Sequence, residues 1–244
     1  MNGVEEKARI KFSKVTEGWE PRTSLGRKVK SGEITDIDTV LNDGYKVLEA
    51  EVIDMLLPNL SSELMMIGQA KGKFGGGQRR VFKQTQKKTA EGNKPHFSTA
   101  VVVGNQDGYV GIGYGKSKET VPAREKAIRK AKLNIFKIRR GCGSWECGCR
   151  TGHSIPYMVT GKVGSVVVRL IPAPKGTGLV AEKEVQKILQ AAGIRDIWSK
   201  SIGQTRTKFN MIMATDAALR KLTKTKVKPA SAERLGLIEG KIVA

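Results

Sequence analysis

The chain is poor in aromatic residues, poor in acidic residues and free of long apolar runs. Aromatic residues make up 5% of its 244 residues, which argues against a surface that reads single-stranded bases by stacking. No run of 18 apolar residues occurs and residues 1–30 lack the apolar segment of a signal peptide, so we expect a cytoplasmic protein without a membrane anchor. With two histidines and no paired carboxylates in an apolar setting, we expect neither a small-molecule substrate nor enzyme activity.

The shortage of acidic residues leaves a large positive charge. Lysine and arginine number 44 against 23 aspartates and glutamates, which gives a net charge of +21. Such a charge opposes compaction unless a polyanion neutralises it, and the candidates are nucleic acid and an anionic membrane surface. The basic helix lacks the Trp- or Leu-rich face that binds lipid, so nucleic acid is favoured. Structured RNA, recognised by shape and phosphates, suits a lysine-rich chain with few aromatics.

Residues 109–138 combine a glycine-rich strand with a basic helix. Gly111, Gly113 and Gly115 recur at period two, so they share one face of a predicted strand, where another backbone or an RNA strand could approach closely. The helix is predicted over 121–138, with Thr120 as its N-cap. Its apolar stripe comprises Ile128, Ala131, Ile135 and Ile138. The basic residues that flank this stripe are Arg124, Lys126, Arg129, Lys130, Lys132, Lys137, Arg139 and Arg140.

Residues 71–94 are predicted to form a long basic β-hairpin arm. They hold eight basic side chains and one acid, and a tip at 75–77 whose glycine amides can approach phosphates. A solvated linker is the alternative, but a linker has no need of such one-sided charge. We therefore predict an RNA-binding surface on this arm and on the layer that follows it. Its residues are Lys71, Lys73, Phe74, Gly75, Gly76, Arg79, Arg80, Lys83, Lys87, Lys88, Lys116, Arg124, Lys126, Arg129 and Lys130.

The pattern of elements predicts an α+β fold, with a first domain at 33–140. An acidic amphipathic helix at 33–57, broken or kinked near Gly44, leads into this domain. The acidic face is interpreted as solvated surface or as a dock for a basic neighbour. The strands predicted in this domain are 64–70, 79–90, 99–103 and 109–114.

A second α+β domain is predicted at 155–222, with the element order ββαβα. Residues 141–154 would be a linker between the domains. The two ends of the chain, 1–32 and 223–244, show little periodicity and are expected to be an irregular arm and tail. Within the arm, Trp19 is expected to cover a small apolar patch.

The linker holds a cluster of metal-binding residue types. Cys142, Cys147, Cys149 and His153 form C-x4-C-x-C-x3-H, and three thiolates with one imidazole are a sufficient ligand set for one structural zinc. The spacing differs from the usual C-x2-C pairs, so free thiols in a Gly-rich linker, with Trp145 packed nearby, are the alternative. A catalytic Cys–His pair is not predicted, because no third group is suggested to orient the histidine.

The segment Gly115-Lys116-Ser117 ends like the phosphate-binding loop of nucleotide-dependent enzymes. That loop needs a glycine five positions before Gly115, where this chain has Val110. A nucleotide-dependent or RNA-modifying enzyme is therefore not supported.

Two segments carry a resemblance to a known family. The residues GYVGIGYGKSKE, VPAR, KAI and KAK within 108–132, and APKGTGLVAEKEVQKILQAAGIRDIWSKSIGQT at 173–205, are similar to signatures of the universal small-subunit ribosomal protein number five family. TEGWEPRTSLGRKVKSG, residues 16–32, resembles the archaeal and eukaryotic-type branch of that family.

The resemblance implies a first domain of the double-stranded-RNA-binding-like fold and a ribosomal role. It implies contacts with small-subunit ribosomal RNA and with the small-subunit ribosomal proteins numbered four and eight. It further implies a place near the path of the incoming mRNA and an influence on decoding accuracy. A free-standing double-stranded-RNA-binding regulator is the alternative.

Overall fold

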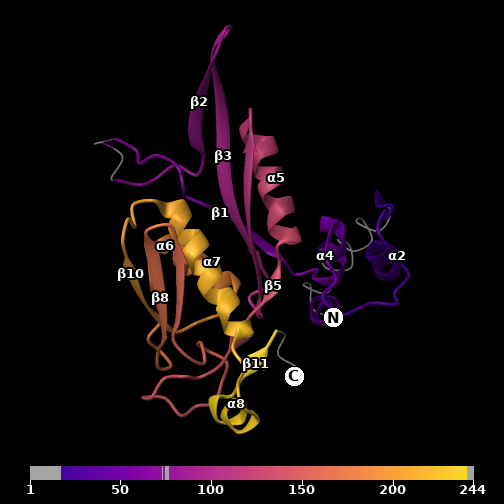
Figure 1. The fold of residues 1–244 in the computed structure, drawn as a ribbon, viewed down its shortest axis with the longest axis vertical. Coiled ribbons are helices and arrows are strands. Elements are labelled where there is room, and N and C mark those ends of the chain that lie inside the picture. The colour runs from indigo at the N-terminus through magenta and orange to yellow at the C-terminus, as the bar shows by residue number, and fades with distance from the viewer. Residues whose placement is uncertain (1–17, 73, 75–76, 241–244) are drawn as a thin grey trace.

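The computed structural model describes residues 18–72, 74 and 77–240, and these contain two larger sheets with helices packed against them and a third sheet of two short strands (Figure 1). The predicted α+β fold is confirmed. The first sheet has the order β1-β3-β4-β5, with β2 paired to the outer part of β3. Its strands are β1 (Ser61–Met65), β2 (Lys83–Thr89), β3 (Gly92–Gly104), β4 (Tyr109–Ser117) and β5 (Phe136–Lys137). Within the described ranges, no helix has the length and apolar character needed to cross a membrane.

Helix α5 (Thr120–Leu133) lies directly on β4, because small residues line both surfaces. A Cβ added to Gly113 would lie 2.1 Å from the carbonyl oxygen of Ala127, and one on Gly115 would lie 2.1 Å from that of Ala123. Real atoms cannot approach so closely, so glycine is required on this face. The close approach expected of the glycine face is therefore made by the chain's own helix.

The helix differs from its prediction at both ends. Its N-cap is Glu119 rather than Thr120, and it ends at Leu133. Asn134 stops it, because its side-chain amide donates to the carbonyl of Ile112 and the chain then turns to pair β5 with β4. Ile135 and Ile138, predicted in the helical stripe, therefore lie beyond the helix. The residues of α5 that are buried against the sheet are Ala123, Ala127 and Ala131.

Strand β3 has thirteen residues and joins two different environments. Its residues 98–104 are buried between β1 and β4, whereas its residues 92–95 are exposed and pair with β2 alone. The β2–β3 hairpin consequently extends beyond the rest of the molecule (Figure 1). Strands predicted at 64–70 and 79–90 are found at Ser61–Met65 and Lys83–Thr89.

The single basic arm predicted at 71–94 is in fact two projections. One is the loop of residues 71–78, which is closed by a bridge between Ala70 and Arg79 and by a hydrogen bond from Lys71 N to Gln78 O. The other is the β2–β3 hairpin, which turns at Thr89–Gly92. The glycines at 75 and 76, predicted at the tip, lie outside the described residues.

The second sheet has the order β7-β8-β10-β9 and packs against α6 and α7. Its elements are β7 (Val159–Val163), β8 (Val166–Pro172), β9 (Leu179–Val180), α6 (Lys183–Ala191), β10 (Ile197–Ile202) and α7 (Lys208–Lys224). The predicted ββαβα order holds, with the short β9 as an addition that pairs in parallel with β10. Gly161 in β7 repeats the close packing of β4, since a Cβ there would lie 1.9 Å from the carbonyl oxygen of Ala214 in α7.

One continuous cluster of buried side chains joins the two sheets. The face of the first sheet opposite α5 presents Val102, Val110 and Ile112, and they belong to the same cluster as Ile188 and Leu189 of α6. Polar contacts reinforce the junction: Met66 N donates to the Glu184 carboxylate over 2.9 Å, and Lys187 Nζ donates to the carbonyl oxygen of Leu64.

The segment before the first sheet forms a small separate core from α2 (Ser24–Lys30), α3 (Ile37–Asn42) and α4 (Ala50–Leu56). Trp19 is buried in this core and its indole nitrogen donates to Glu49, so the predicted covering role is confirmed. The break near Gly44 is also confirmed, with a φ of +73°. The helix predicted over 33–57 is not helical at Tyr45 and Leu48, where the chain leaves helical geometry and both side chains are exposed.

The two predicted extensions contain regular structure as well. The N-terminal one includes α2, and the C-terminal one includes α8 (Pro229–Leu235) and β11 (Ile238–Glu239). Strand β11 pairs antiparallel with β6 (Arg139–Arg140), which follows β5 directly. Cys142 N donates to Leu235 O over 2.8 Å, so this C-terminal segment closes over the junction between the sheets.

Candidate functional site

The β2–β3 hairpin carries exposed positive charge on a part of the sheet that has no core beneath it. Lys83, Lys87 and Lys88 are exposed on β2, and Lys94 is exposed on β3 beside Glu91, with which it forms an ion pair. Side chains on both faces of the hairpin are open to solvent from residue 83 to residue 88. The structure thus places three of the predicted RNA-binding lysines together on one projection.

The loop of residues 71–78 contributes a second basic projection, although not every predicted residue on it is available. Lys71 and Arg80 are exposed and Phe74 is fully exposed. Arg79, by contrast, donates to the carbonyl oxygens of Gly68 and Arg206, the second over 2.9 Å. Its guanidinium therefore anchors the loop to the second sheet's half of the molecule. Lys73, Gly75 and Gly76 lie outside the described residues.

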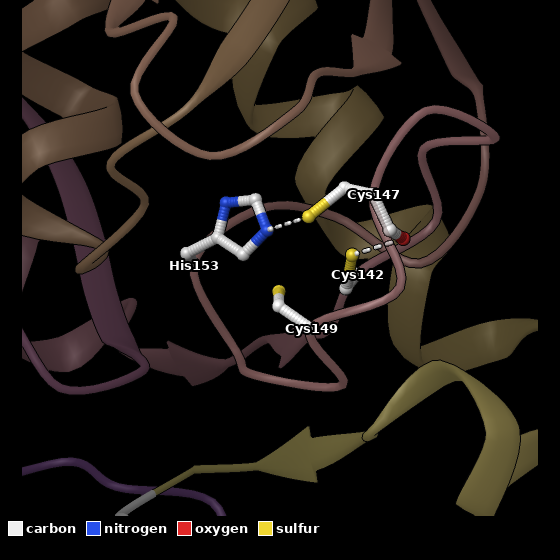
Figure 2. Close-up of side chains that lie close together, drawn as sticks. All are labelled: Cys142, Cys147, Cys149 and His153. Atoms are coloured by element: carbon white, nitrogen blue, oxygen red, sulfur yellow. Dashed lines mark hydrogen bonds between the residues drawn. The ribbon is translucent and has the colours of Figure 1, made fainter.

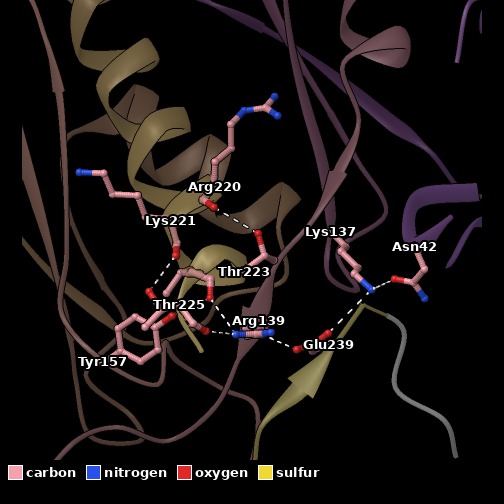
Figure 3. Close-up of polar contacts among 10 residues, drawn as sticks. Asn42, Lys137, Arg139, Tyr157, Arg220, Lys221, Thr223, Thr225 and Glu239 are labelled. Atoms are coloured by element: carbon pink, nitrogen blue, oxygen red, sulfur yellow. Dashed lines mark hydrogen bonds and ion pairs between the residues drawn. The ribbon is translucent and has the colours of Figure 1, made fainter. Parts of the chain in front are cut away.

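The basic residues of the strand–helix layer divide into an outward and an inward group. The outward group is exposed and consists of the predicted residues Lys116, Arg124, Lys126, Arg129 and Lys130. The inward group contacts the protein itself: Lys132 pairs with Asp54 and Arg140 pairs with Asp107. Figure 3 shows Lys137 between Asn42 and Glu239, and Arg139 between Glu239 and Thr225. The inward group of basic residues therefore joins parts of the chain to one another.

The four predicted metal ligands converge at one point in the linker (Figure 2). One ligand atom from each of Cys142, Cys147, Cys149 and His153 lies within 4.8 Å of the other three. His153 Nε2 faces the thiols, 3.9 Å from Cys147 Sγ, and all three cysteines are free. Trp145 is exposed, so it does not pack on the cluster as the free-thiol alternative expected.

This donor set fits a tetrahedral metal ion. Zinc–sulfur bonds of ~2.3 Å and a zinc–nitrogen bond of ~2.0 Å place tetrahedral ligand atoms ~3.5–3.8 Å apart, so the observed cluster needs to contract by only ~1 Å. Cys142 and His153 are buried and the other two cysteines are half-buried, which is the enclosure expected of a structural site. The Cys3His cluster can hold a metal ion.

The environments of the thiols differ. Burial, followed by the neighbouring cysteines, raises the pKa of Cys142 to about 11. A hydrogen bond with the hydroxyl of Thr151, 3.1 Å away, lowers the pKa of Cys149 to about 6. The lowered pKa favours the thiolate of Cys149 at neutral pH, and Cys149 is therefore expected to react faster than Cys142.

Asp196, 43 positions after His153, completes the surroundings of the cluster, and the sequence contains no signal for it. Its Oδ2 lies 2.8 Å from His153 Nδ1 and both side chains are buried. The residue stands just before β10, where it reads as an ordinary polar position beside a strand. Asp196 reaches the cluster because the 194–196 segment lies against the linker. A hydrogen bond from Asp196 N to His153 O holds the two segments together.

Comparison with known proteins gives consistent matches over most of the chain. The family model for the N-terminal domain of ribosomal protein S5 matches residues 78–139, and that for its C-terminal domain matches residues 161–234. Small ribosomal subunit protein uS5 of Nanoarchaeum equitans is 50% identical over 227 residues, covering 93% of this chain and 97% of the relative. The proteins of that name from Methanocaldococcus jannaschii and Pyrobaculum islandicum are 46% and 48% identical, covering 92% and 83% of this chain and 97% and 93% of the relatives.

Proposed function

The chain belongs to the ribosomal protein S5 family, and from this premise we propose that it is a structural, ribosomal-RNA-binding component of the small ribosomal subunit. The observation that carries the proposal is the β2–β3 hairpin. Its exposed lysines lie on a ribbon whose two faces are both open to solvent, so packing within the chain does not explain why it is there. A polyanion that neutralises the charge on both faces would explain the presence of the hairpin.

The RNA surface comprises the hairpin, the loop of residues 71–78 and the outward face of α5. These parts all carry exposed lysine or arginine, whereas the acidic segment of α3 and α4 lies at the other end of α5 from the hairpin (Figure 1). Phosphate contacts of this kind position a protein on structured RNA and make binding strongly dependent on salt. The protein acts through these contacts and not as an enzyme.

The acidic segment is the surface proposed for neighbouring proteins. Asp36, Asp43 and Leu48 are exposed in this segment, on a chain that is otherwise strongly basic. A basic protein surface complements such a patch better than RNA does. The family resemblance supports the proteins numbered four and eight as neighbours, a position near the incoming mRNA and an effect on decoding accuracy.

The five-part division of the chain is retained as part of this proposal. It consists of an arm (1–32), an RNA-binding domain with its acidic leader (33–140), a linker (141–154), a second α+β domain (155–222) and a tail (223–244).

One structural zinc is proposed at Cys142, Cys147, Cys149 and His153. It would cross-link the linker at the point where the two sheets meet, because binding such an ion and ordering its ligands are one equilibrium. Metal analysis of reduced protein purified without chelators should give one zinc per chain. A value near zero, with three freely titratable thiols, would contradict the zinc.

Sedimentation tests the ribosomal role directly. The native protein should travel with small ribosomal subunits through a high-salt gradient, because a structural component is held by many contacts at once. A free-standing regulator of double-stranded RNA would instead be released and remain at the top of the gradient. That result would replace the ribosomal proposal with the regulator.

A further inference from the structure

Asp196 is a buried residue whose two carboxylate oxygens have different hydrogen-bond partners. Oδ2 lies 2.8 Å from His153 Nδ1, while Oδ1 accepts hydrogen bonds from the backbone amides of Gly176 and Gly178 over 3.0 and 2.9 Å. The residue is 5% exposed. A carboxylate only accepts hydrogen bonds when ionised, so all three partners must be donors.

An ionised Asp196 places a ring hydrogen of His153 on Nδ1. Because Oδ2 accepts, the ring hydrogen belongs on Nδ1, and Nε2 then presents its lone pair. Nε2 is the nitrogen that faces the thiols, 3.9 Å from Cys147 Sγ. The ring is also held through its backbone, since the carbonyl of His153 accepts from the amides of Arg195 and Asp196.

We propose that Asp196 is the positioning residue of the metal centre, and that it couples metal occupancy to the order of the Gly176–Gly178 loop. The inference rests on the proposed zinc. An ion bound at Nε2 makes the Nδ1 hydrogen a stronger donor, which strengthens the bond to Asp196 and holds the carboxylate in place for the two loop amides. By linkage, ordering of the loop favours metal binding to the same extent.

The loop faces a cleft, so the coupling reaches a surface. The cleft has a volume of about 850 Å³ and lies between the turn of residues 105–107 and the second sheet's half of the molecule. Its wall includes His153, Asp196 and Gly176, and Lys175 and Arg195 are exposed on it. Loss of the metal is expected to loosen this wall while the sheets stay folded.

A cysteine nucleophile activated by a histidine–aspartate pair has the same connectivity. The structure favours a metal, because three thiols converge on one nitrogen and a nucleophile needs only one. The two interpretations differ in the effect of zinc. A metal site would bind zinc tightly, whereas a cysteine nucleophile would need neither of the other two cysteines.

Asp196→Asn is the test variant. An asparagine can offer its oxygen to the two glycine amides only by turning its NH2 toward His153, which drives the ring hydrogen to Nε2, where the metal would bind. Turning the amide the other way sets its NH2 against two backbone donors. Either way the zinc affinity, measured by competition with a chromophoric chelator, should fall about 10- to 100-fold. Asp216→Asn is the matched control, because Asp216 is also a buried aspartate but pairs with Arg220 on α7.

The outcomes separate the two proposals. If the wild-type protein binds no zinc, the proposed zinc site is wrong. Zinc binding by Asp196→Asn that equals wild type, with the control also unchanged, overturns the positioning role alone.

Hydrogen exchange decides the question without a variant, should Asp196→Asn fail to fold. In the wild-type protein, added zinc should slow exchange at the amides of Gly176 and Gly178, with no change at the equally turn-located Gly164. Equal exchange at the loop with and without zinc would overturn the coupling.

Discussion

The two halves of β3 show how differently one strand can be held. Its inner half, residues 98–104, is buried, with α5 on one face and the core shared with α6 and α7 on the other. Its outer half, residues 92–95, has β2 as its only neighbour in the sheet and solvent on both faces. A two-stranded ribbon without an apolar face is marginal in water. The inner half is therefore specified by packing, whereas the outer half lacks a packing partner, and RNA is the partner that we propose for it.

The largest expected effect comes from disturbing the inner half. Gly113→Val places its Cβ about 2 Å from the backbone of α5, so the helix must leave the sheet, and we expect the free energy of unfolding to fall by ~3 kcal/mol or more. Denaturant unfolding measures this. Gly72→Val is the control, because a Cβ there meets nothing within 4 Å. A stable Gly113→Val protein would show that the inner half is not set by close packing.

Neutralising the outer half should change RNA binding and leave stability alone. Replacing Lys83, Lys87 and Lys88 by Gln should reduce the slope of log affinity against log salt by about 2–3 on structured small-subunit RNA, with unfolding changed by less than ~0.5 kcal/mol.

Lys162, Lys200 and Lys226, replaced together, provide a control of equal charge on exposed positions elsewhere. An unchanged slope for the hairpin variant, or an equal loss in the control, would assign the binding to net charge and not to the hairpin.

The linker of residues 141–154 is a third case, held neither by a large core nor by RNA. In metal-free protein at pH 7, Cys149 should be alkylated at least ~10-fold faster than Cys142, because its pKa is lowered to about 6 while that of the buried Cys142 is raised to about 11.

Zinc should protect all three cysteines, as read by mass spectrometry of the labelled protein. As pH falls through about 6, Cys149 gains its proton and its own labelling rate should fall, while its advantage over Cys142 persists. Equal rates for the two thiols at pH 7 would show that the cluster does not differentiate them.

The smallest effect is expected at Glu49, a single charge that supports a packed core. Its burial alone would raise the pKa, but hydrogen bonds from the backbone amides of Thr23 and Arg22, with the Trp19 indole, outweigh burial and lower it. A lowered carboxyl pKa stabilises the fold above the ordinary value near 4.3, and this stabilisation is lost as pH falls through the folded-state pKa.

Glu49→Gln should therefore cost about 1 kcal/mol at pH 7, allowing for solvent screening, and progressively less toward pH 3. Unfolding at several pH values measures the difference from wild type. A difference that stays constant with pH would show that the charge plays no part.

Sequence reasoning succeeded where local pattern and packing agree. The alternating strands at 99–103 and 109–114 and the helix after Gly178 were located because their side chains repeat with the period of the element. The predictions failed where contacts with residues distant in the sequence determine the local structure. Apolar periodicity alone could not show that the seam of α5 consists of alanines, because the required closeness comes from the glycines of β4.

The candidate site shows the same division. The four candidate metal ligands stand close together in the sequence and were found by their residue types, whereas Asp196 reaches them only through the tertiary fold. Nor could charge alone show that Arg79 and Arg140 bind the protein's own carbonyl and carboxylate groups instead of RNA.

The pairing of β11 with β6 has a consequence for the order in which the chain matures during synthesis. Both sheets and their helices lie before residue 225, so they can assemble while the final residues are still being added. The linker cannot close at that stage, because Cys142 N donates to Leu235 O and Arg140 donates to the carbonyl of Gly240. Closure of the junction therefore requires that synthesis has passed residue 240.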